Sequence, residues 1–456
     1  MKKGFQLFQL NVDRIPGFDA LGPDDFSPAT AAERAAMVET RPSVSYWRDA
    51  ARRFKANRVS MAALFLFLLI FLFSCLGPLF IPYNYSDQYR ASGKLGPGEH
   101  SKAEQIVMKA EAVSDRFFAT SMMPGSLTSL NRNTTYWFRY RGTTYSFFNE
   151  TSVGSAVLLF NAGAETPLTL IKEADLDAGE LDRAEPVAYS TAAVDPKAEN
   201  TTELKMLKRV FPHVFGTDSS GRDLMARTMY GGRVSIAVGI IAALIVLIIG
   251  SVYGSVSGLA GGRVDFVMMR LVDIIYSVPD VLIVLLLQVV LKSPLQAWLD
   301  ASATRFARLM SNLGVGIISI FITFACLYWV GMSRIVRGQV LQLKEQEFVT
   351  AANALGVPGR RIVKRHLLPN CVGQLIIATC LQIPSAIFLE SFLSFLGLGV
   401  SIPMTSLGSL CSDALDTITL YPYRLLFPGI ILTLLVLSLN LVGDGIRDAL
   451  DPRLKK

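Results

Sequence analysis

The sequence predicts an all-α polytopic membrane protein with six spanning helices and a small α+β domain inserted outside the membrane. Three observations lead to this fold class. Of the 456 residues, 51% are hydrophobic and 18% are charged, whereas an ordinary soluble domain has roughly 25% charged residues. Uncharged apolar stretches of membrane-spanning length recur along the chain. One long segment, 83–223, contains no such stretch and is instead polar with short aromatic runs.

Six stretches are long and apolar enough to cross about 30 Å of hydrocarbon as helices. The first does not resemble a secretion signal, because it starts near residue 59, is too long, and ends in Gly77-Pro78 instead of a small-x-small cleavage site. We expect it to be kept as the first helix. The six expected spans are Val59–Pro82, Ser235–Leu259, Phe266–Leu291, Leu313–Ser333, Leu367–Phe388 and Leu425–Val442.

The distribution of basic residues predicts the orientation, because cytoplasmic loops are enriched in Lys and Arg. Four basic residues between 52 and 58 precede the first span and place the N-terminus in the cytoplasm. Six crossings return the C-terminus to that side. Segment 83–223 has 15 basic and 18 acidic residues, which suits the outer side. The net charge of +7 therefore reflects topology, and we expect no binding to nucleic acid.

Four regions follow from this topology: a cytoplasmic tail (1–50), a basic helix and first span (51–82), an outer domain (83–223), and the remaining five spans (224–456). We expect the basic amphipathic helix over Asp49–Arg58 to lie at the membrane surface. In the outer domain the patterns predict helices over 101–117 and Leu204–Val210, a hairpin of Thr134–Tyr140 with Thr143–Phe148 about Arg141-Gly142, and a strand over Ala156–Phe160.

Several signatures of catalysis are missing from the sequence. The chain has no GxxxxGK[ST] phosphate loop and no HExxH, CxxC or GxSxG motif. Its three histidines are far apart, which argues against a metal cluster. We therefore expect no enzyme active site, metal or cofactor on this chain. If it performs active transport, the energy comes from another subunit or from an ion gradient.

The loop between the fourth and fifth spans carries the most specific pattern, a helix, a break and a second helix. Phe348, Ala351, Ala352 and Leu355 fall on one helical face. Gly356 suits the left-handed position after a helix. The positive-inside rule alone would explain the basic residues that follow, but not an apolar stripe facing the cytosol. We therefore expect a helix that docks onto a soluble partner.

This loop resembles the EAA loop of ABC importer permeases, whose pattern is E-A-A-x3-G-x9-I-x-L-P. Ala351 and Ala352 match the alanines, Gly356 the glycine, and Leu368-Pro369 the final pair. Thr350 and His366 depart from the pattern, and the form F-V-x-A-A-x-x-L-G…H-L-L-P-N is similar to the dipeptide/oligopeptide/nickel permease family. Other segments resemble that family in the same order, namely Tyr46–Phe54, Phe215–Leu224, Met269–Asp273 with Pro279, Leu393–Gly399 after Glu390, and Gly443–Pro452.

The resemblance implies a type I importer in a bacterial-type cytoplasmic membrane. This permease would pair with a second permease, two cytoplasmic ATPases that bind ATP and Mg, and an extracytoplasmic substrate-binding protein. The loop at 344–366 would then couple to the ATPases. Peptides are the expected substrate, and nickel or another small solute is the alternative. The loop residues expected to act are Glu347, Phe348, Ala351, Ala352, Leu355, Gly356, Arg360, Arg361, His366 and Pro369.

Acidic residues within or beside the spans form a second candidate set. Asp273, Asp280 and Glu390 are costly if they face lipid. They would line a pathway or, as we favour, lie near the interface or at a subunit contact. Two other functions compete with the importer: an ion-driven secondary transporter, and a membrane-anchored interaction protein that acts through segment 83–223. The first would need more intramembrane charges, and the second needs neither six spans nor a coupling loop.

Overall fold

The computed structural model describes residues 45–450, with gaps at 87, 89–92, 102–103, 106–107, 109–120, 123–127, 162–164, 173–174, 176–182, 184, 205–210, 303 and 401–403. The chain divides into two units after residue 52, and of the first unit only residues 45–52 are described. Within the described residues, six helices are long and apolar enough to cross a membrane, which confirms the expected number. These are Arg58–Leu79, Leu224–Ala260, Asp280–Ala301, Val315–Lys344, Gly359–Phe395 and Tyr423–Leu450.

The first part of the chain forms two helices in sequence. Helix α2 runs over Tyr46–Ala56, close to the expected basic helix. Asn57 then caps α3 (Arg58–Leu76), because its side chain accepts hydrogen bonds from the backbone N–H groups of Val59 and Ser60. A short 3-10 turn, η4 (Gly77–Leu79), ends this span at a proline.

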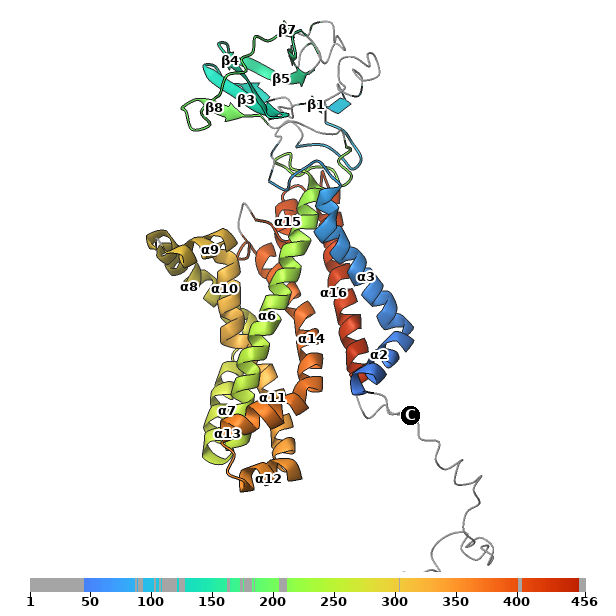
Figure 1. Ribbon diagram of the computed structural model, residues 1–456, viewed down its shortest axis with the longest axis vertical. Helices are drawn as coiled ribbons and strands as arrows, with labels where there is room; N and C mark the ends of the chain where they lie inside the picture. Colours follow the sequence, from blue (N-terminus) through green and yellow to red (C-terminus); the bar gives the residue numbers. More distant parts are fainter. Residues whose placement is uncertain are drawn as a thin grey trace, which may run out of the picture. The chain divides into compact units, whose positions relative to one another are not determined.

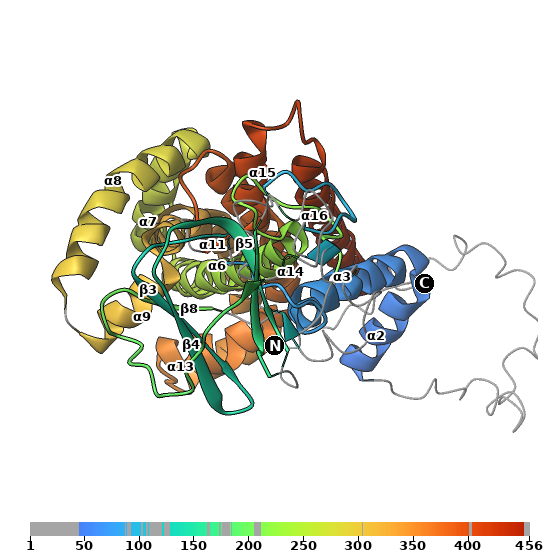
Figure 2. The same ribbon diagram turned by 90° about the horizontal axis from the view of Figure 1, so that it is seen from above.

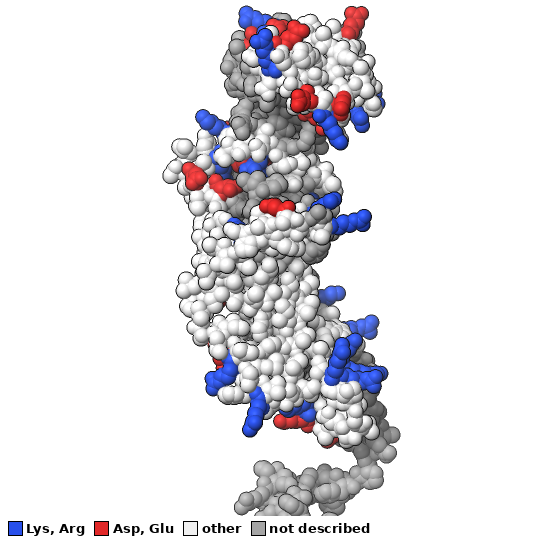
Figure 3. Space-filling model, turned by 90° about the vertical axis from the view of Figure 1, so that its left-hand side faces the viewer, with Lys and Arg blue, Asp and Glu red and all other residues white. Residues whose placement is uncertain are grey.

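The body is built around α6 (Leu224–Ala260), which contacts α3, α11 (Trp329–Lys344) and α14 (Leu368–Phe395). Helix α16 (Tyr423–Leu450) packs against α3 and α14. Figure 1 shows these helices side by side, and Figure 2 places α6 and α14 between the α7–α8 pair and the α3–α16 pair. On the face in Figure 3, charged residues are sparse in the middle of this body.

Glycines allow α6 and α11 to approach closely. Gly250, Gly254 and Gly258 recur every four residues on α6, and a Cβ at any of them would collide with atoms of α11. Small residues at this spacing are typical of close helix pairs in membranes. The G-x-x-x-G pattern is visible in the sequence and could have predicted this pairing.

The third expected span, Phe266–Leu291, is wrong as a single helix. The chain forms α7 (Gly262–Tyr276), breaks at Ser277–Pro279, and continues as α8 (Asp280–Ala301). Pro279 lacks an N–H and its ring clashes with the preceding turn, which explains the break.

The fourth span runs further than expected, to Lys344. It consists of α10 (Val315–Thr323), a π-helical turn η7 (Phe324–Tyr328) and α11. The basic residues Arg334 and Arg337 therefore lie on a helix and not in the loop. Two short helices, α9 (Arg305–Leu313) and α15 (Leu407–Leu415), were not expected from the sequence.

The inserted segment contains two small sheets. The strands are β1 (Ser121–Met122), β2 (Thr128–Leu130), β3 (Thr134–Tyr140), β4 (Thr143–Asn149), β5 (Val153–Phe160), β6 (Leu168–Lys172), β7 (Glu185–Pro186) and β8 (Thr201–Glu203). The first sheet has the order β4-β3-β8, with β8 parallel to β3. In the second sheet β5 pairs antiparallel with β1, β2 and β6, and β6 also pairs with β7. Their aromatic core includes Phe138 against Phe160, with ring centroids 5.0 Å apart.

The expected hairpin is confirmed. β3 and β4 pair from Thr134 opposite Asn149 to Tyr140 opposite Thr143. Arg141 and Gly142 both have positive φ, of 44° and 88°, as a tight two-residue turn of this kind requires. Of the helix expected at 101–117, only residues 101, 104–105 and 108 are described, and 104, 105 and 108 are helical. Of the helix expected at Leu204–Val210, only Leu204 is described, and it is not helical.

Candidate functional site

The loop between α11 and α14 forms the expected helix, break and second helix. Helix α12 spans Glu347–Ala354, α13 spans Gly359–Ile362, and a π turn, η8 (Val363–Leu367), joins α13 to α14. Gly356 has a φ of +73°. Its N–H donates to the carbonyl of Asn353, and the N–H of Val357 donates to that of Ala352. This pair of bonds is a Schellman motif, which fixes where α12 ends.

The loop has a buried root and an exposed apolar tip. Val349, Ile362 and Leu367 are fully buried, and Ala352 is 7% exposed. All four belong to the main hydrophobic core of the helical body. The expected single face is therefore wrong at Ala352, which packs inward, whereas Phe348 (42% exposed), Leu355 (83% exposed) and Ala351 face outward.

The other loop residues are mostly exposed as well. Glu347, Arg360, Arg361 and Pro369 are exposed, and His366 is half-buried. The loop therefore presents exposed apolar side chains beside charged ones, the composition of a surface that binds a partner.

Sequence reasoning missed the contacts that anchor the preceding helix. The Arg337 guanidinium on α11 donates two hydrogen bonds of 2.5 Å to the Asp265 carboxylate on α7. These bonds, with a further one from Ser257, hold the pKa of Asp265 at about 2, against an ordinary 3.8. Lys344 also donates to the carbonyl of Gly258 on α6, at 3.2 Å. The base of α11 is thus tied to α6 and α7.

The three candidate acidic residues lie in different environments. Asp273 is half-exposed and pairs with Arg334 at 2.9 Å. Asp280 is exposed at the first turn of α8 and lines a cavity of about 490 Å³ beside the break in the third span. Glu390 is completely buried within this chain. Ser235 and Ser394 donate to its carboxylate at 3.0 and 2.7 Å. Within this chain, the Glu390 carboxylate therefore makes its polar contacts internally.

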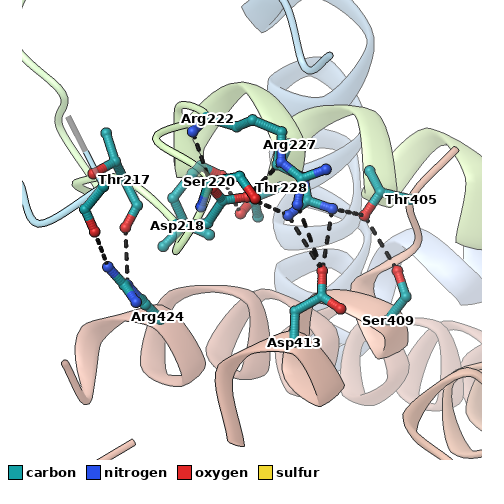
Figure 4. Close-up of polar contacts among 12 residues, drawn as sticks. Thr217, Asp218, Ser220, Arg222, Arg227, Thr228, Thr405, Ser409, Asp413 and Arg424 are labelled. Atoms are coloured by element: carbon teal, nitrogen blue, oxygen red, sulfur yellow. Dashed lines mark hydrogen bonds and ion pairs between the residues drawn. The ribbon is translucent and has the colours of Figure 1, made fainter. Parts of the chain in front are cut away.

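The opposite end of the body carries a network of charges (Figure 4). Arg227 on α6 is 2% exposed and lies between Asp218 (2.5 Å) and Asp413 of α15 (3.3 Å). Arg222 also binds Asp218, at 2.7 Å. This segment also caps α6, because Asp223 accepts a hydrogen bond of 2.7 Å from the N–H of Ala226.

A second set of contacts joins α16 to the base of the inserted segment. Arg424 donates to the carbonyls of Gly93 and Thr217, at 2.5 and 3.0 Å. Tyr423 donates to the carbonyl of Leu95, at 2.6 Å. The N-terminal end of the insert is therefore attached to α16, and its C-terminal end to α15, α16 and the start of α6.

Comparisons with known proteins agree with this architecture. Residues 250–456 match the family of binding-protein-dependent transport system inner membrane components, and residues 45–97 match the N-terminal TM domain of oligopeptide transport permease C. Among solved structures, an inward-facing conformation of the MetNI methionine ABC transporter covers 50% of this chain and 98% of its own, with 17% identity and a TM-score of 0.38.

Three curated relatives are similar over about half of this chain. The oligopeptide transport system permease protein OppC of Bacillus subtilis is 45% identical over 54% of this chain and 73% of its own. The dipeptide transport system permease protein DppC of the same organism is 42% identical over 54% and 70%. OppC of Escherichia coli is 44% identical over 53% and 72%. The chain therefore belongs to the family of inner-membrane permease components of binding-protein-dependent ABC importers.

Proposed function

We propose that this chain is the permease subunit of an ATP-driven importer that carries di- or oligopeptides across the cytoplasmic membrane. Family membership and the six apolar helices support a multi-pass permease. The relatives named for oligopeptide and dipeptide transport support peptides over nickel or another small solute. The family assignment also replaces the ion-driven transporter and the membrane-anchored interaction protein as candidates.

An importer of this family needs other subunits. In the proposed assembly this chain pairs with a second permease and receives peptide from an extracytoplasmic binding protein. Two cytoplasmic ATPase subunits bind ATP and Mg and carry out hydrolysis, so this chain itself is not catalytic. Its termini lie in the cytoplasm and residues 83–223 outside, in accordance with the basic residues before α3 and the slightly acidic insert.

One observation carries the proposal: the apolar tip of α12 on a buried root. Phe348 and Leu355 are exposed on an eight-residue helix, which cannot be stable alone. Val349 and Ala352 fix that helix in the core. An exposed apolar tip held rigidly by packing is suited to receive a push from a docked ATPase and to pass it to α11 and α14.

The test is a pair of substitutions at Leu355, which is the most exposed apolar residue of the tip. Leu355→Asp places a carboxylate where a partner would exclude water, and Leu355→Met keeps an apolar side chain of similar volume. We expect Leu355→Asp to reduce recovery of the ATPase subunits in a pull-down at least tenfold, equivalent to about 1.4 kcal/mol. Leu355→Met should behave as the parent protein.

Membrane insertion serves as the control, because Leu355 packs against little of its own chain. Both variants should reach the membrane in equal amounts. Wild-type recovery of the ATPases with Leu355→Asp would contradict the assignment of this loop.

A further inference from the structure

The cavity beside Asp280 lies where the third span is broken. The break between α7 and α8, the π turn η7 and the middle of α14 form its walls. Tyr328 lies 13 residues after the start of the Val315–Lys344 span, and Gln382 lies 14 residues after the start of α14 and 13 before its end. The cavity is therefore close to the middle of the helical body, and its volume of about 490 Å³ is in the range of ligand pockets.

A broken helix at this depth needs an explanation. Irregular backbone within a membrane is stable only where protein covers it or where it lines a water-filled space. In this chain Tyr276 is 69% exposed and Val278 is 45% exposed. The described part of the chain thus leaves the break uncovered on one side. The break faces either an aqueous pathway or another subunit.

Asp280 is the one charged residue among those that line the cavity. Its carboxylate accepts a hydrogen bond from the N–H of Val281, at 2.9 Å. Among the described residues no Lys, Arg or His forms an ion pair with it. The Asp280 carboxylate thus has no counter-charge among the described residues of the chain.

The rest of the lining indicates which cation suits this anion. The side chain of Tyr328 lines the same cavity, and aromatic faces attract organic ammonium groups. Tyr276 also lines the cavity, but the Arg334 guanidinium lies over its ring, 4.7 Å from the ring centroid. Ca²⁺ or Mg²⁺ would need six or more oxygen ligands, among which carboxylates predominate, and the lining offers one carboxylate. A peptide at neutral pH carries an α-ammonium group, because the pKa of such amines is near 7.7–8.0.

We propose that Asp280 and Tyr328 form a transient site for the protonated α-amino group of a peptide crossing the membrane. This inference rests on the proposed function. The exposure of Asp280 suits a transient site, since a transport pathway must bind its cargo weakly enough to release it. Removing the carboxylate leaves the ammonium group without a counter-charge midway across the membrane.

The experiment uses the complete importer, with the second permease, the ATPases and the binding protein, reconstituted in proteoliposomes. The probes are a peptide and its N-acetyl form, chosen so that the binding protein captures both. Uptake is measured with saturating loaded binding protein, so that capture does not limit the rate. The variants are Asp280→Asn, Asp280→Glu, and Asp300→Asn, which removes a carboxylate from the other end of α8.

We expect Asp280→Asn to slow uptake of the free peptide about tenfold, equivalent to about 1.4 kcal/mol, and to leave uptake of the acetylated peptide unchanged. Asp280→Glu should restore most of the rate, and Asp300→Asn should match the parent. Equal slowing of both peptides, or of neither, would overturn the proposal. So would loss of the second permease from the purified Asp280→Asn complex, which would assign Asp280 to the subunit contact. If the parent complex carries neither peptide, the proposed function itself fails.

Discussion

Gly356 allows the coupling role of the α12–α13 loop to be tested with one set of variants. Its φ of +73° is a left-handed conformation that costs an ordinary L-residue roughly 1–2 kcal/mol. A Cβ placed on Gly356 meets no atom within 4 Å. Within this chain, a substitution there is therefore opposed by the backbone conformation and not by a steric clash. Any larger effect must come from a partner that covers the loop.

Three substitutions separate these two causes. Gly356→Asn introduces a side chain that tolerates the left-handed region. Gly356→Ala adds a smaller side chain, but alanine does not tolerate the left-handed conformation, so the turn should be destabilised by about 1 kcal/mol, a fivefold shift in its equilibrium. Gly356→Arg destabilises the turn by the same amount and adds a long cationic side chain. We expect all three to insert normally, Asn and Ala to retain uptake within about fivefold of the parent, and Arg to abolish uptake and ATPase binding.

The assays are membrane content, peptide uptake in proteoliposomes, and co-purification of the ATPase subunits. Comparing the uptake rates of Gly356→Asn and Gly356→Ala shows how much of the loss comes from the backbone conformation. If backbone strain is the only cause, Gly356→Ala should be slower than Gly356→Asn. Wild-type uptake by Gly356→Arg would refute the assignment of the loop, since no docked partner could then cover this position.

Two further predictions concern packing and pH. Gly408→Ala would place a Cβ within 2.7 Å of the Ser391 backbone, so overpacking should lower the free energy of unfolding by about 1–3 kcal/mol. The control is Gly429→Ala, whose new Cβ would meet no atom within 4 Å and should not lower the free energy of unfolding. Equal melting temperatures for the two variants would contradict the packing argument. Because the pKa of Asp265 is about 2 when folded and 3.8 otherwise, its pairing with Arg337 should stabilise the folded protein above pH 4, by about 1 kcal/mol once solvent screening is included, and lose this contribution as the pH falls toward 2. Thermal melting of Asp265→Asn should thus show a constant deficit from pH 8 to 5 that shrinks below pH 4, and a deficit that grows on acidification would refute it.

The number of spans could be predicted from the sequence because uncharged runs of 20 residues arise from one physical requirement. Their ends could not. Helix α6 begins at Leu224, well before the expected Ser235, because Arg227 and Arg233 are paired inside the protein. Arg227 binds Asp218 and Asp413, and Arg233 donates to the carbonyl of Ser74 at 2.6 Å. A hydropathy pattern counts both arginines as polar, and only the tertiary structure supplies their partners.

The candidate site shows the same division between local and distant information. The turn at Gly356 depends on nearby residues and was predicted correctly. The helical period placed Phe348 and Ala352 on one face, but only packing decides which side of a short helix turns inward, and Ala352 is buried while Phe348 is exposed. The Asp265–Arg337 pair spans 72 residues, so no local pattern indicates it.

The α12–α13 loop and the cavity at Asp280 share one continuous core, and this constrains how a displacement of α12 would be transmitted. Val349 and Leu367 pack in the same buried cluster as Val340 of α11 and Phe324 of η7, and the cavity residue Tyr328 packs against that cluster. Close-packed cores move as bodies and do not deform continuously. Helix α11 is in turn held to α6 by glycine contacts and to α7 by Asp265. Displacing α12 therefore requires α6, α7 and α11 to move together. Changes in backbone conformation are then expected in segments outside this packed core. The uncovered break at Ser277–Pro279 is such a segment, and it lies beside the cavity.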